Sequence, residues 1–324
     1  ATTETKRRVS SEGITILPLG AMDAPSLDAL SRLSLAPTGK RRNRPLPSVS
    51  RKNIKTVIKT DNAMADQSDL ETAWHELRVH WAIEPSPKDL PATPVYSALR
   101  LLISPFLRPL LRWRINGADR IPRKGATILA ANHLSHVDPI AVIAAARRTT
   151  YYLAKDGHFT NRWTRFIMRS TGQIETDREA GAGDALAGAA RILESQRALG
   201  IFPEGTRSKR PSPPYLLPGK TGVARLAAAY PHATVVPVAL VGTREVMQPQ
   251  HHKWPRLYRR FDVNAGVGVS WLQWLGAEQG GNMTPAMLES LGKAEEHEIT
   301  SELARLYRTF TDQLMASLSA LGAP

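Results

Sequence analysis

The chain has 324 residues, enough for one large domain or two small ones, and 42% of its residues are hydrophobic, which excludes disorder throughout. It contains no cysteine, so disulfide bonds, thiolate nucleophiles and Cys-based zinc sites are excluded. Its formal net charge of +14 favours anionic partners: phospholipid headgroups, coenzyme A phosphates, acidic carrier proteins or nucleic acid.

Residues 1–66 are predicted to form a basic, disordered tail. Residues 1–60 contain twelve Lys or Arg but four acidic residues, and they are rich in Ser and Pro without a sustained period. Such a segment cannot bury enough apolar surface to offset its ordering entropy. Three interpretations remain open: a transit peptide for an organelle, a true basic tail, or translated sequence upstream of a start at Met64. None of them gives the tail a catalytic role.

Residues 67–92 are predicted to be a short helix followed by a Pro-rich linker. Leu70, Trp74, Leu77 and Trp81 recur at helical spacing, and a run of prolines begins at Pro85. We expect a domain boundary in this linker, with the main domain at residues 93–324.

The next segment, residues 95–111, is apolar but contains Arg100 and Arg108, and Arg112, Trp113 and Arg114 follow it. An apolar face with an arginine rim and a tryptophan suits a helix that lies in a membrane surface. A buried helix with arginines reaching to solvent explains the pattern equally well. The chain has no run of eighteen apolar residues, so a spanning helix is not expected.

From residue 117 onward, strand and helix patterns alternate. Strands are predicted at 127–131, 150–154, 173–176 and 234–241, and helices at 139–147, 159–169, 184–199 and 222–229. Gly200 is predicted to end the third of these helices as a C-terminal cap, and a last packing helix is predicted at 293–321. This alternation indicates an α/β fold with a mixed, mostly parallel sheet flanked by helices. Functional residues of such sheets gather beyond the strand ends.

His133 and Asp138 lie at one such strand end, in the segment NHLSHVD. A carboxylate beside one ring nitrogen orients an imidazole, and the other nitrogen can then take a proton from a hydroxyl group. Among nine histidines, one match to the spacing H-x4-D is unremarkable by itself. A metal site at His133, His136 and Asp138 is the alternative, but no second ligand cluster is evident, so we expect no metal and a structural role for His136.

A second strand end carries Glu204, Gly205, Thr206 and Arg207, which form a turn rich in hydrogen-bond donors. A guanidinium binds phosphate through two parallel hydrogen bonds, and glycine lets the backbone approach a ligand closely. Lys220 adds a further cation before a predicted helix N-terminus. Arg178, just past the strand 173–176, is a third candidate, although such a residue is usually a solvated arginine.

Two familiar motifs are excluded. Gly219-Lys220-Thr221 resembles the end of a Walker A loop, but Pro214 stands where that motif requires glycine. No serine lies in the pattern G-x-S-x-G, so the nucleophile elbow of serine hydrolases is absent.

The order of these segments resembles the glycerolipid acyltransferase family, typified by 1-acyl-glycerol-3-phosphate acyltransferases. The resemblance covers about residues 93–245, and its most specific part is the third of four segments: NHLSHVD (132–138), GQIETDR (172–178), FPEGTRS (202–208) and VVPVAL (235–240). The lead-in NGADRIP (116–122) is also similar.

The resemblance implies transfer of a fatty acyl group from acyl-CoA or an acyl carrier protein to the hydroxyl of lysophosphatidate, without an acyl-enzyme or a cofactor. His133 would be the general base, Asp138 its orienting partner, and Arg178 and Arg207 the clamp on the acceptor phosphate. The rest of that pocket would be shaped by the turn 204–206, with Pro237 in its wall. Glycerol-3-phosphate or another lysolipid is the alternative acceptor.

The resemblance and the basic charge together lead us to expect a peripheral or monotopic enzyme on the cytoplasmic face of a membrane, or in an organelle if the tail targets it there. A basic binding protein for membranes or nucleic acid is a hypothesis of a different class. The tail has no regularly interleaved aromatic residues for stacking on bases, so we expect no nucleic-acid partner.

Overall fold

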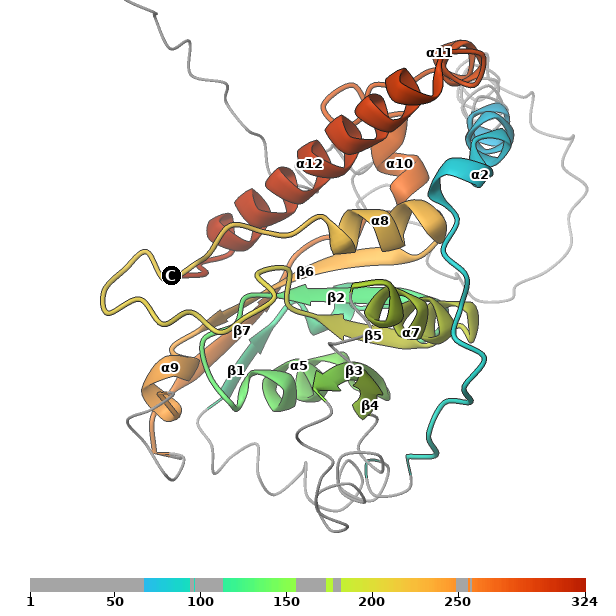
Figure 1. The fold of residues 1–324 in the computed structure, drawn as a ribbon. Coiled ribbons are helices and arrows are strands. Elements are labelled where there is room, and N and C mark those ends of the chain that lie inside the picture. The colour runs from blue at the N-terminus through green and yellow to red at the C-terminus, as the bar shows by residue number, and fades with distance from the viewer. Residues whose placement is uncertain are drawn as a thin grey trace, which may run out of the picture.

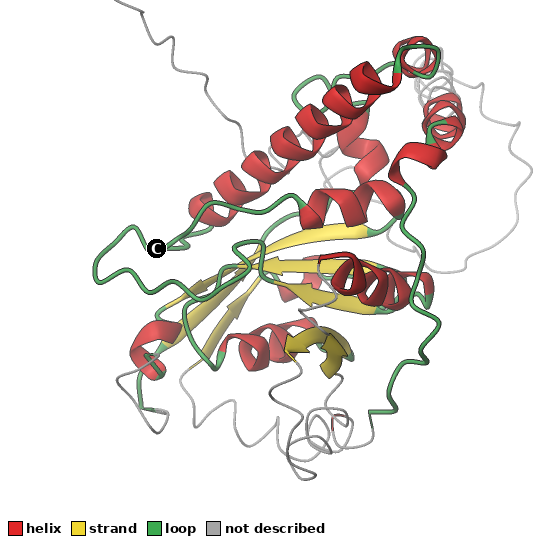
Figure 2. Ribbon diagram, viewed as in Figure 1, coloured by secondary structure: helices red, strands yellow, loops and turns green. Residues whose placement is uncertain are grey.

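The computed structural model describes residues 67–93, 96, 113–155, 173–176, 182–248, 256 and 258–324. The predicted tail at 1–66, the predicted helix 159–169, Arg178 and nearly all of the segment 95–112 lie outside the described residues. The described part forms one seven-stranded sheet with helices on both faces (Figures 1 and 2).

The sheet is mixed and mostly parallel, as the sequence predicts. Its strand order is β1-β7-β6-β2-β5-β3-β4. Strands β2 to β6 run parallel to one another, whereas β7 runs antiparallel to β6, and β1 runs parallel to β7. The strands are β1 (Trp113–Asn116), β2 (Thr127–Ala131), β3 (Thr150–Lys155), β4 (Gln173–Thr176), β5 (Ala198–Ile201), β6 (Thr234–Val241) and β7 (Phe261–Ala265).

The central strand β2 is buried along its whole length and sends alternate side chains into two cores. Ile128 and Ala130 belong to the core under α7 (Ala182–Glu194), α8 (Gly222–Ala229), α10 (Trp271–Leu275) and α12 (Glu296–Ala320). Leu129 and Ala131 belong to the core on the opposite face, under α5 (Asp138–Ala146). This two-sided burial explains why β2 and β6 are nearly continuous apolar runs.

The predicted helix at 67–82 is present: residues 67–76 are helical, and α2 (Arg78–Trp81) follows. Its apolar side chains pack into the main core rather than forming a separate one. Trp74 is 1% exposed, lies 5.4 Å (between ring centroids) from both Trp81 and Trp271, and donates from Nε1 to the carbonyl oxygen of Ala228. The Pro-rich stretch therefore crosses the surface of a shared core, although the sequence suggested a boundary there.

The predicted C-terminal packing helix corresponds to α12, and every residue of its apolar stripe is buried: Ile299, Leu303, Leu306, Phe310, Leu314 and Leu318. It is preceded by α11 (Pro285–Leu291), and α9 (Thr243–Val246) follows β6. Within the described ranges, no helix combines the length and the hydropathy needed to span a bilayer.

The predicted helix 184–199 is too long, because the chain turns at Gln196, which has a φ of 56°, and continues as strand β5. Gly200 is not a helix cap: it lies inside β5 beneath the ring of Tyr152. A Cβ atom on Gly200 would lie 2.1 Å from Cζ of that ring. The short apolar run 198–201 fits a helix end or a buried strand equally well, and the ring packing decides between them.

The predicted membrane-surface segment 95–111 lies almost wholly outside the described residues, and the structure describes only the end of its arginine rim. Trp113 and Arg114 belong to strand β1, and the ring of Trp113 packs 4.9 Å from that of Phe261 on the neighbouring strand β7. The edge strand β1 and its neighbour β7 were both missed from the sequence, because each is short and they pair with each other across more than 140 residues of chain. The described residues give no support to a membrane-associating helix.

Candidate active site

The two sequence motifs meet at one edge of the sheet. Strands β2 and β5 are parallel neighbours, with Ala130 opposite Ile201. The segments that follow the two strands therefore leave the sheet on the same side, so residues 132–138 and 202–208 lie next to each other. The backbone N–H of Ser208 donates to the carbonyl oxygen of His133 at 3.0 Å, which ties the two loops together.

His133 and Asp138 form the pair that the sequence predicts. Nδ1 of His133 lies 2.9 Å from Oδ2 of Asp138. The same carboxylate oxygen accepts hydrogen bonds of 2.6 Å from the backbone N–H groups of Leu134 and Ser135. Asp138 is fully buried at the first turn of α5, where Pro139 follows it. Three donors thus fix the carboxylate, and the carboxylate fixes the imidazole.

The other ring nitrogen, Nε2 of His133, has no hydrogen-bond partner among the described residues, and 17% of the side chain is exposed. The ring stacks on Phe202, with centroids 3.9 Å apart and planes within 10°. Phe202 in turn stacks on Tyr152 at 5.6 Å. The imidazole is therefore held from its Nδ1 side and from one face, which leaves Nε2 able to accept a proton from a substrate.

Asn132 anchors the His133 loop to the sheet, a role that sequence reasoning missed. Its side-chain amide donates to the carbonyl oxygen of Leu240 at 3.0 Å and accepts from the N–H of Leu240 at 2.7 Å. Asn132 is fully buried. Because β6 pairs with β2 only as far as Ala131 opposite Val238, this side chain extends the pairing by one step beyond the strand. A polar residue at the end of an apolar strand was the only available signal.

Glu204 supports the backbone of His133 rather than facing an anion. Its Oε1 accepts from the N–H of His133 at 2.6 Å, and its Oε2 accepts from the N–H of Leu217 at 2.9 Å. The residue is 2% exposed. An ionised carboxylate offers only acceptors and would repel a phosphate. The structure thus places Glu204 beside the base, with both carboxylate oxygens bonded to the backbone of His133 and Leu217.

Burial raises the pKa of Glu204 from 4.5 to about 7. The negative charge of Asp138 adds to this increase, whereas the hydrogen bonds from the two backbone N–H groups and the charge of Arg210 lower the pKa without offsetting desolvation. Glu204 therefore changes its charge near neutral pH while bonded to the backbone of His133.

Gly205 and Lys220 lie in direct contact. Gly205 has a φ of +70°, and a Cβ atom there would lie 2.9 Å from Nζ of Lys220. The N–H of Lys220 also donates to the carbonyl oxygen of Pro203 at 2.8 Å. Glycine thus permits both the turn and the close approach of the ammonium group. Lys220 is exposed, and no described carboxylate forms an ion pair with it.

The remaining residues predicted to bind an anion differ in their exposure, and one of them is not described by the structure. Thr206 is exposed, and Arg207 is half-buried with Nη1 against the ring of His136. His136 is exposed and belongs to this contact with Arg207. Arg178 lies outside the described residues, although β4, which precedes it, is parallel to β3 and ends at the same sheet edge as β2. No group of three or more potential metal ligands occurs in the described part of the chain.

Residues 112–241 match the family model described as Acyltransferase. The matched residues include the His133–Asp138 pair, the 202–208 loop and the strands that position them. Residues 112–241 of the chain are therefore similar to the acyltransferase family.

Two curated relatives that this chain matches are 1-acyl-sn-glycerol-3-phosphate acyltransferases. The protein from Borreliella burgdorferi is 29% identical over 97 residues, which are 29% of this chain and 39% of the relative. The protein from Bacillus subtilis is 25% identical over 130 residues, which are 40% of this chain and 62% of the relative. The chain thus aligns with less than two thirds of either relative.

A solved structure, the 1-acyl-sn-glycerophosphate (LPA) acyltransferase PlsC from Thermotoga maritima, is 17% identical to this chain. It matches over 76% of this chain and 95% of its own, with a TM-score of 0.39.

Proposed function

We propose that this acyltransferase transfers a fatty acyl group from an acyl thioester, acyl-CoA or an acylated carrier protein, to the free hydroxyl of lysophosphatidate and so produces phosphatidate. The observation that carries the proposal is the pairing of Nδ1 of His133 with buried Asp138 beside a loop that presents Arg207 and Lys220. A base with one open nitrogen and an adjacent cationic surface fit an acceptor that bears both a hydroxyl and a phosphate. The curated relatives carry the name of that reaction.

In the proposed reaction, Nε2 of His133 accepts the hydroxyl proton as the hydroxyl oxygen bonds to the thioester carbonyl carbon. The resulting tetrahedral intermediate collapses, its C–S bond breaks, and the leaving thiolate takes the proton from His133. Asp138 keeps Nδ1 as the protonated nitrogen and stabilises the transient imidazolium. No side-chain nucleophile takes part, so no acyl-enzyme forms and no cofactor is required.

The acceptor phosphate would bind Arg207 and Lys220, which lie at the same sheet edge as His133, together with Arg178, which follows β4 in the sequence. The turn at Gly205 and Thr206 would bring backbone close to the ligand, while Glu204 holds the base from behind. We also propose that the enzyme works at the cytoplasmic face of a membrane, where a lysolipid acceptor resides, without a nucleic-acid partner.

The test is acyl transfer from oleoyl-CoA to lysophosphatidate, followed by product chromatography. His133→Ala is expected to reduce transfer by at least about a hundredfold, the size of effect typical of general-base removal. His297→Ala is the matched control, because His297 is an exposed residue of α12. Equal turnover in the His133 variant and the control would refute the proposed mechanism.

Parallel assays with acylated carrier protein, with glycerol-3-phosphate and with other lysolipids identify the donor and the acceptor. Phosphatidate formed with either donor supports the proposed reaction. Transfer to glycerol-3-phosphate alone would replace the acceptor while leaving the roles of His133 and Asp138 in place.

A further inference from the structure

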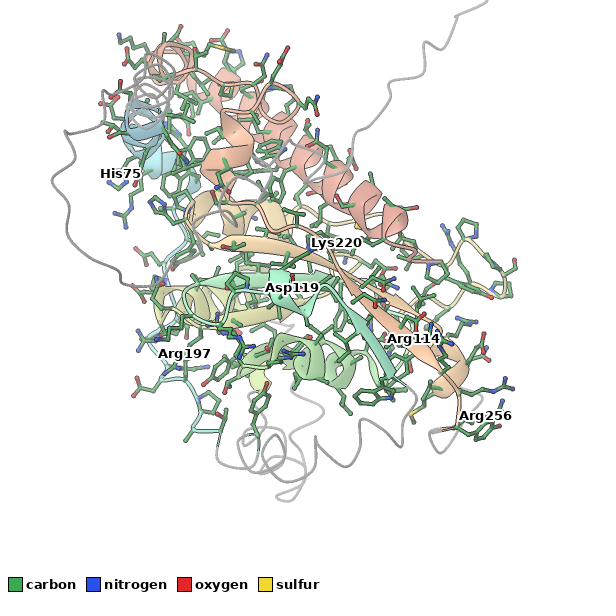
Figure 3. The ribbon with its side chains drawn as sticks, turned by 180° about the vertical axis from the view of Figure 1, so that it is seen from behind. His75, Arg114, Asp119, Arg197, Lys220 and Arg256 are labelled. Carbon is green, nitrogen blue, oxygen red and sulfur yellow. The ribbon has the colours of Figure 1, made fainter. Side chains whose placement is uncertain are left out.

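A second cationic site lies at the opposite edge of the sheet from His133. Strands β2, β3 and β5 begin there, and a cavity of about 330 Å³ opens between the loops that enter them. Four of its lining residues are basic: Arg123, Lys124, Arg148 and Arg197. Figure 3 shows Arg197 well apart from Lys220, which belongs to the catalytic edge.

Arg148 forms the floor of this cavity and is 9% exposed. Its Nη1 donates to the carbonyl oxygen of Pro122 at 3.1 Å and to Oγ1 of Thr127 at 3.3 Å, and its Nη2 donates to the carbonyl oxygen of Gln196 at 3.3 Å. All these partners are neutral, so the guanidinium charge is oriented but not compensated. Burial and the nearby charge of Arg197 lower the pKa of Arg148, consistent with an excess of positive potential.

The other three cations stand at the rim and are exposed. In the described part of the chain, none of the four forms an ion pair with a carboxylate. A folded protein usually places acids near such a group of like charges, because their repulsion destabilises the fold. An anionic ligand would offset both this repulsion and the buried charge of Arg148.

The walls of the cavity are set by the fold. Gly125 has a φ of 82° and Gln196 a φ of 56°, and Oε1 of Gln196 accepts from the N–H of Ala126 at 3.1 Å. This bond joins the loop before β2 to the loop before β5, with Arg148 anchored to both. The cations are therefore held together before a ligand arrives, which reduces the entropy cost of binding.

We propose that this cavity is a second anion site that binds the phosphate or diphosphate group of a ligand other than the acceptor at His133. Planar guanidinium groups match phosphate oxygens through paired hydrogen bonds, and a lysine adds a point charge. The ligand is either a soluble phosphate ester or the headgroup of an anionic lipid, since both present the same chemistry. The site depends on none of the residues assigned to acyl transfer.

The test is calorimetric titration of the full chain with pyrophosphate. Arg197→Gln and the double variant Arg123→Gln/Lys124→Gln remove rim charges from exposed positions, so the fold is expected to persist, as circular dichroism will show. The wild type is expected to bind pyrophosphate at two sites. Each rim variant should weaken binding at the cavity roughly tenfold and leave binding at the site beside His133 unchanged. Arg207→Gln should weaken only the site beside His133. Lys293→Gln, which removes one exposed positive charge elsewhere, is the charge-matched control.

Vesicles of phosphatidylcholine with and without phosphatidylglycerol distinguish the two sources. Weaker binding of Arg197→Gln than of Lys293→Gln to the anionic vesicles, with competition by pyrophosphate, identifies a lipid headgroup. Equal vesicle binding combined with lost pyrophosphate binding identifies a soluble phosphate ester. If the Arg197 variant matches the Lys293 variant in both assays, the cavity is not an anion site and the proposal is overturned.

Discussion

The backbone N–H of His133 donates to Oε1 of Glu204, 71 residues further along the chain, at 2.6 Å. The second oxygen of this carboxylate accepts from Leu217. One buried side chain therefore couples the loop of the base, the loop of the arginine and the segment that leads to Lys220. The precision of the site rests on this bridge, because residues that touch substrate act only when their support is rigid.

Replacing Glu204 by Ala should lower both stability and activity. The N–H groups of His133 and Leu217 would lose their acceptor, at a cost of about 2–4 kcal/mol in the free energy of unfolding. Urea denaturation measures the loss, and the acyl-transfer assay should show a lower kcat. An Ala variant with unchanged stability would mean that water or another acceptor replaces the carboxylate at no cost.

The stability of the protein should also depend on pH through Glu204. Its pKa is about 7 in the folded state against 4.5 in the unfolded state, so the folded state binds the proton more tightly. Its favourable contribution is therefore fully present below pH 4.5 and is lost as the pH rises through 7. The difference is on the order of 3 kcal/mol.

Glu204→Gln isolates this contribution, because glutamine does not titrate. Denaturation midpoints measured between pH 5 and pH 8 should fall more steeply for the wild type than for the Gln variant. Identical slopes for the two proteins would remove Glu204 as the source of the pH dependence.

Asn132→Ala should destabilise the protein by about 2–4 kcal/mol, because both backbone groups of Leu240 would be left buried without partners. Thermal denaturation will detect the loss. Since His133 follows directly, kcat should fall as well. Ser→Ala at position 68 is a control for polar truncation on an exposed surface, and it should leave both quantities near the wild-type values.

Gly205→Ala tests the contact with Lys220. The new methyl group would sit 2.9 Å from Nζ of Lys220, at a backbone φ of +70°. The lysine must move, and the turn is strained by about 1 kcal/mol. The KM for lysophosphatidate should rise roughly tenfold with a smaller change in kcat.

Gly183→Ala is the matched control, because no atom lies within 4 Å of a Cβ atom placed there. Gly183 is a helical residue of α7, so this change should leave KM unaltered and slightly raise stability. Equal KM values for the two Ala variants would exclude a role of Lys220 in acceptor binding.

Trp74→Ala tests whether the segment before the Pro-rich stretch belongs to the domain. The indole is buried against Trp271 and bonded to the carbonyl oxygen of Ala228. Its removal should cost about 3–5 kcal/mol in one cooperative transition. Val79→Ala, at a residue 83% exposed, is the control on the same segment. A loss below 1 kcal/mol for Trp74→Ala would show that this helix is dispensable.

The local sequence pattern was sufficient to predict the elements whose own hydrophobicity shows that they are buried. Strands β2 and β6 and helix α8 match their predicted ranges, because each is a largely apolar run bounded by turn residues, and the short strand β4 also lies where it was predicted. The His133–Asp138 pair was also predictable, since four intervening residues bring the two side chains together at a strand-to-helix turn. The order of the motifs was sufficient to indicate the acyltransferase family.

Only the tertiary structure decided the features that depend on distant partners. Gly200 lies in a strand because the ring of Tyr152 covers it, and Glu204 holds His133 rather than an anion because Leu217 lies on its other side. Trp74 joins the main core, and Arg148 and Arg197 meet at one cavity, through contacts between segments far apart in the chain. Hydrophobic period reports which face of an element is buried. It does not show which residues pack against that face, and the chemistry of a site depends on those residues.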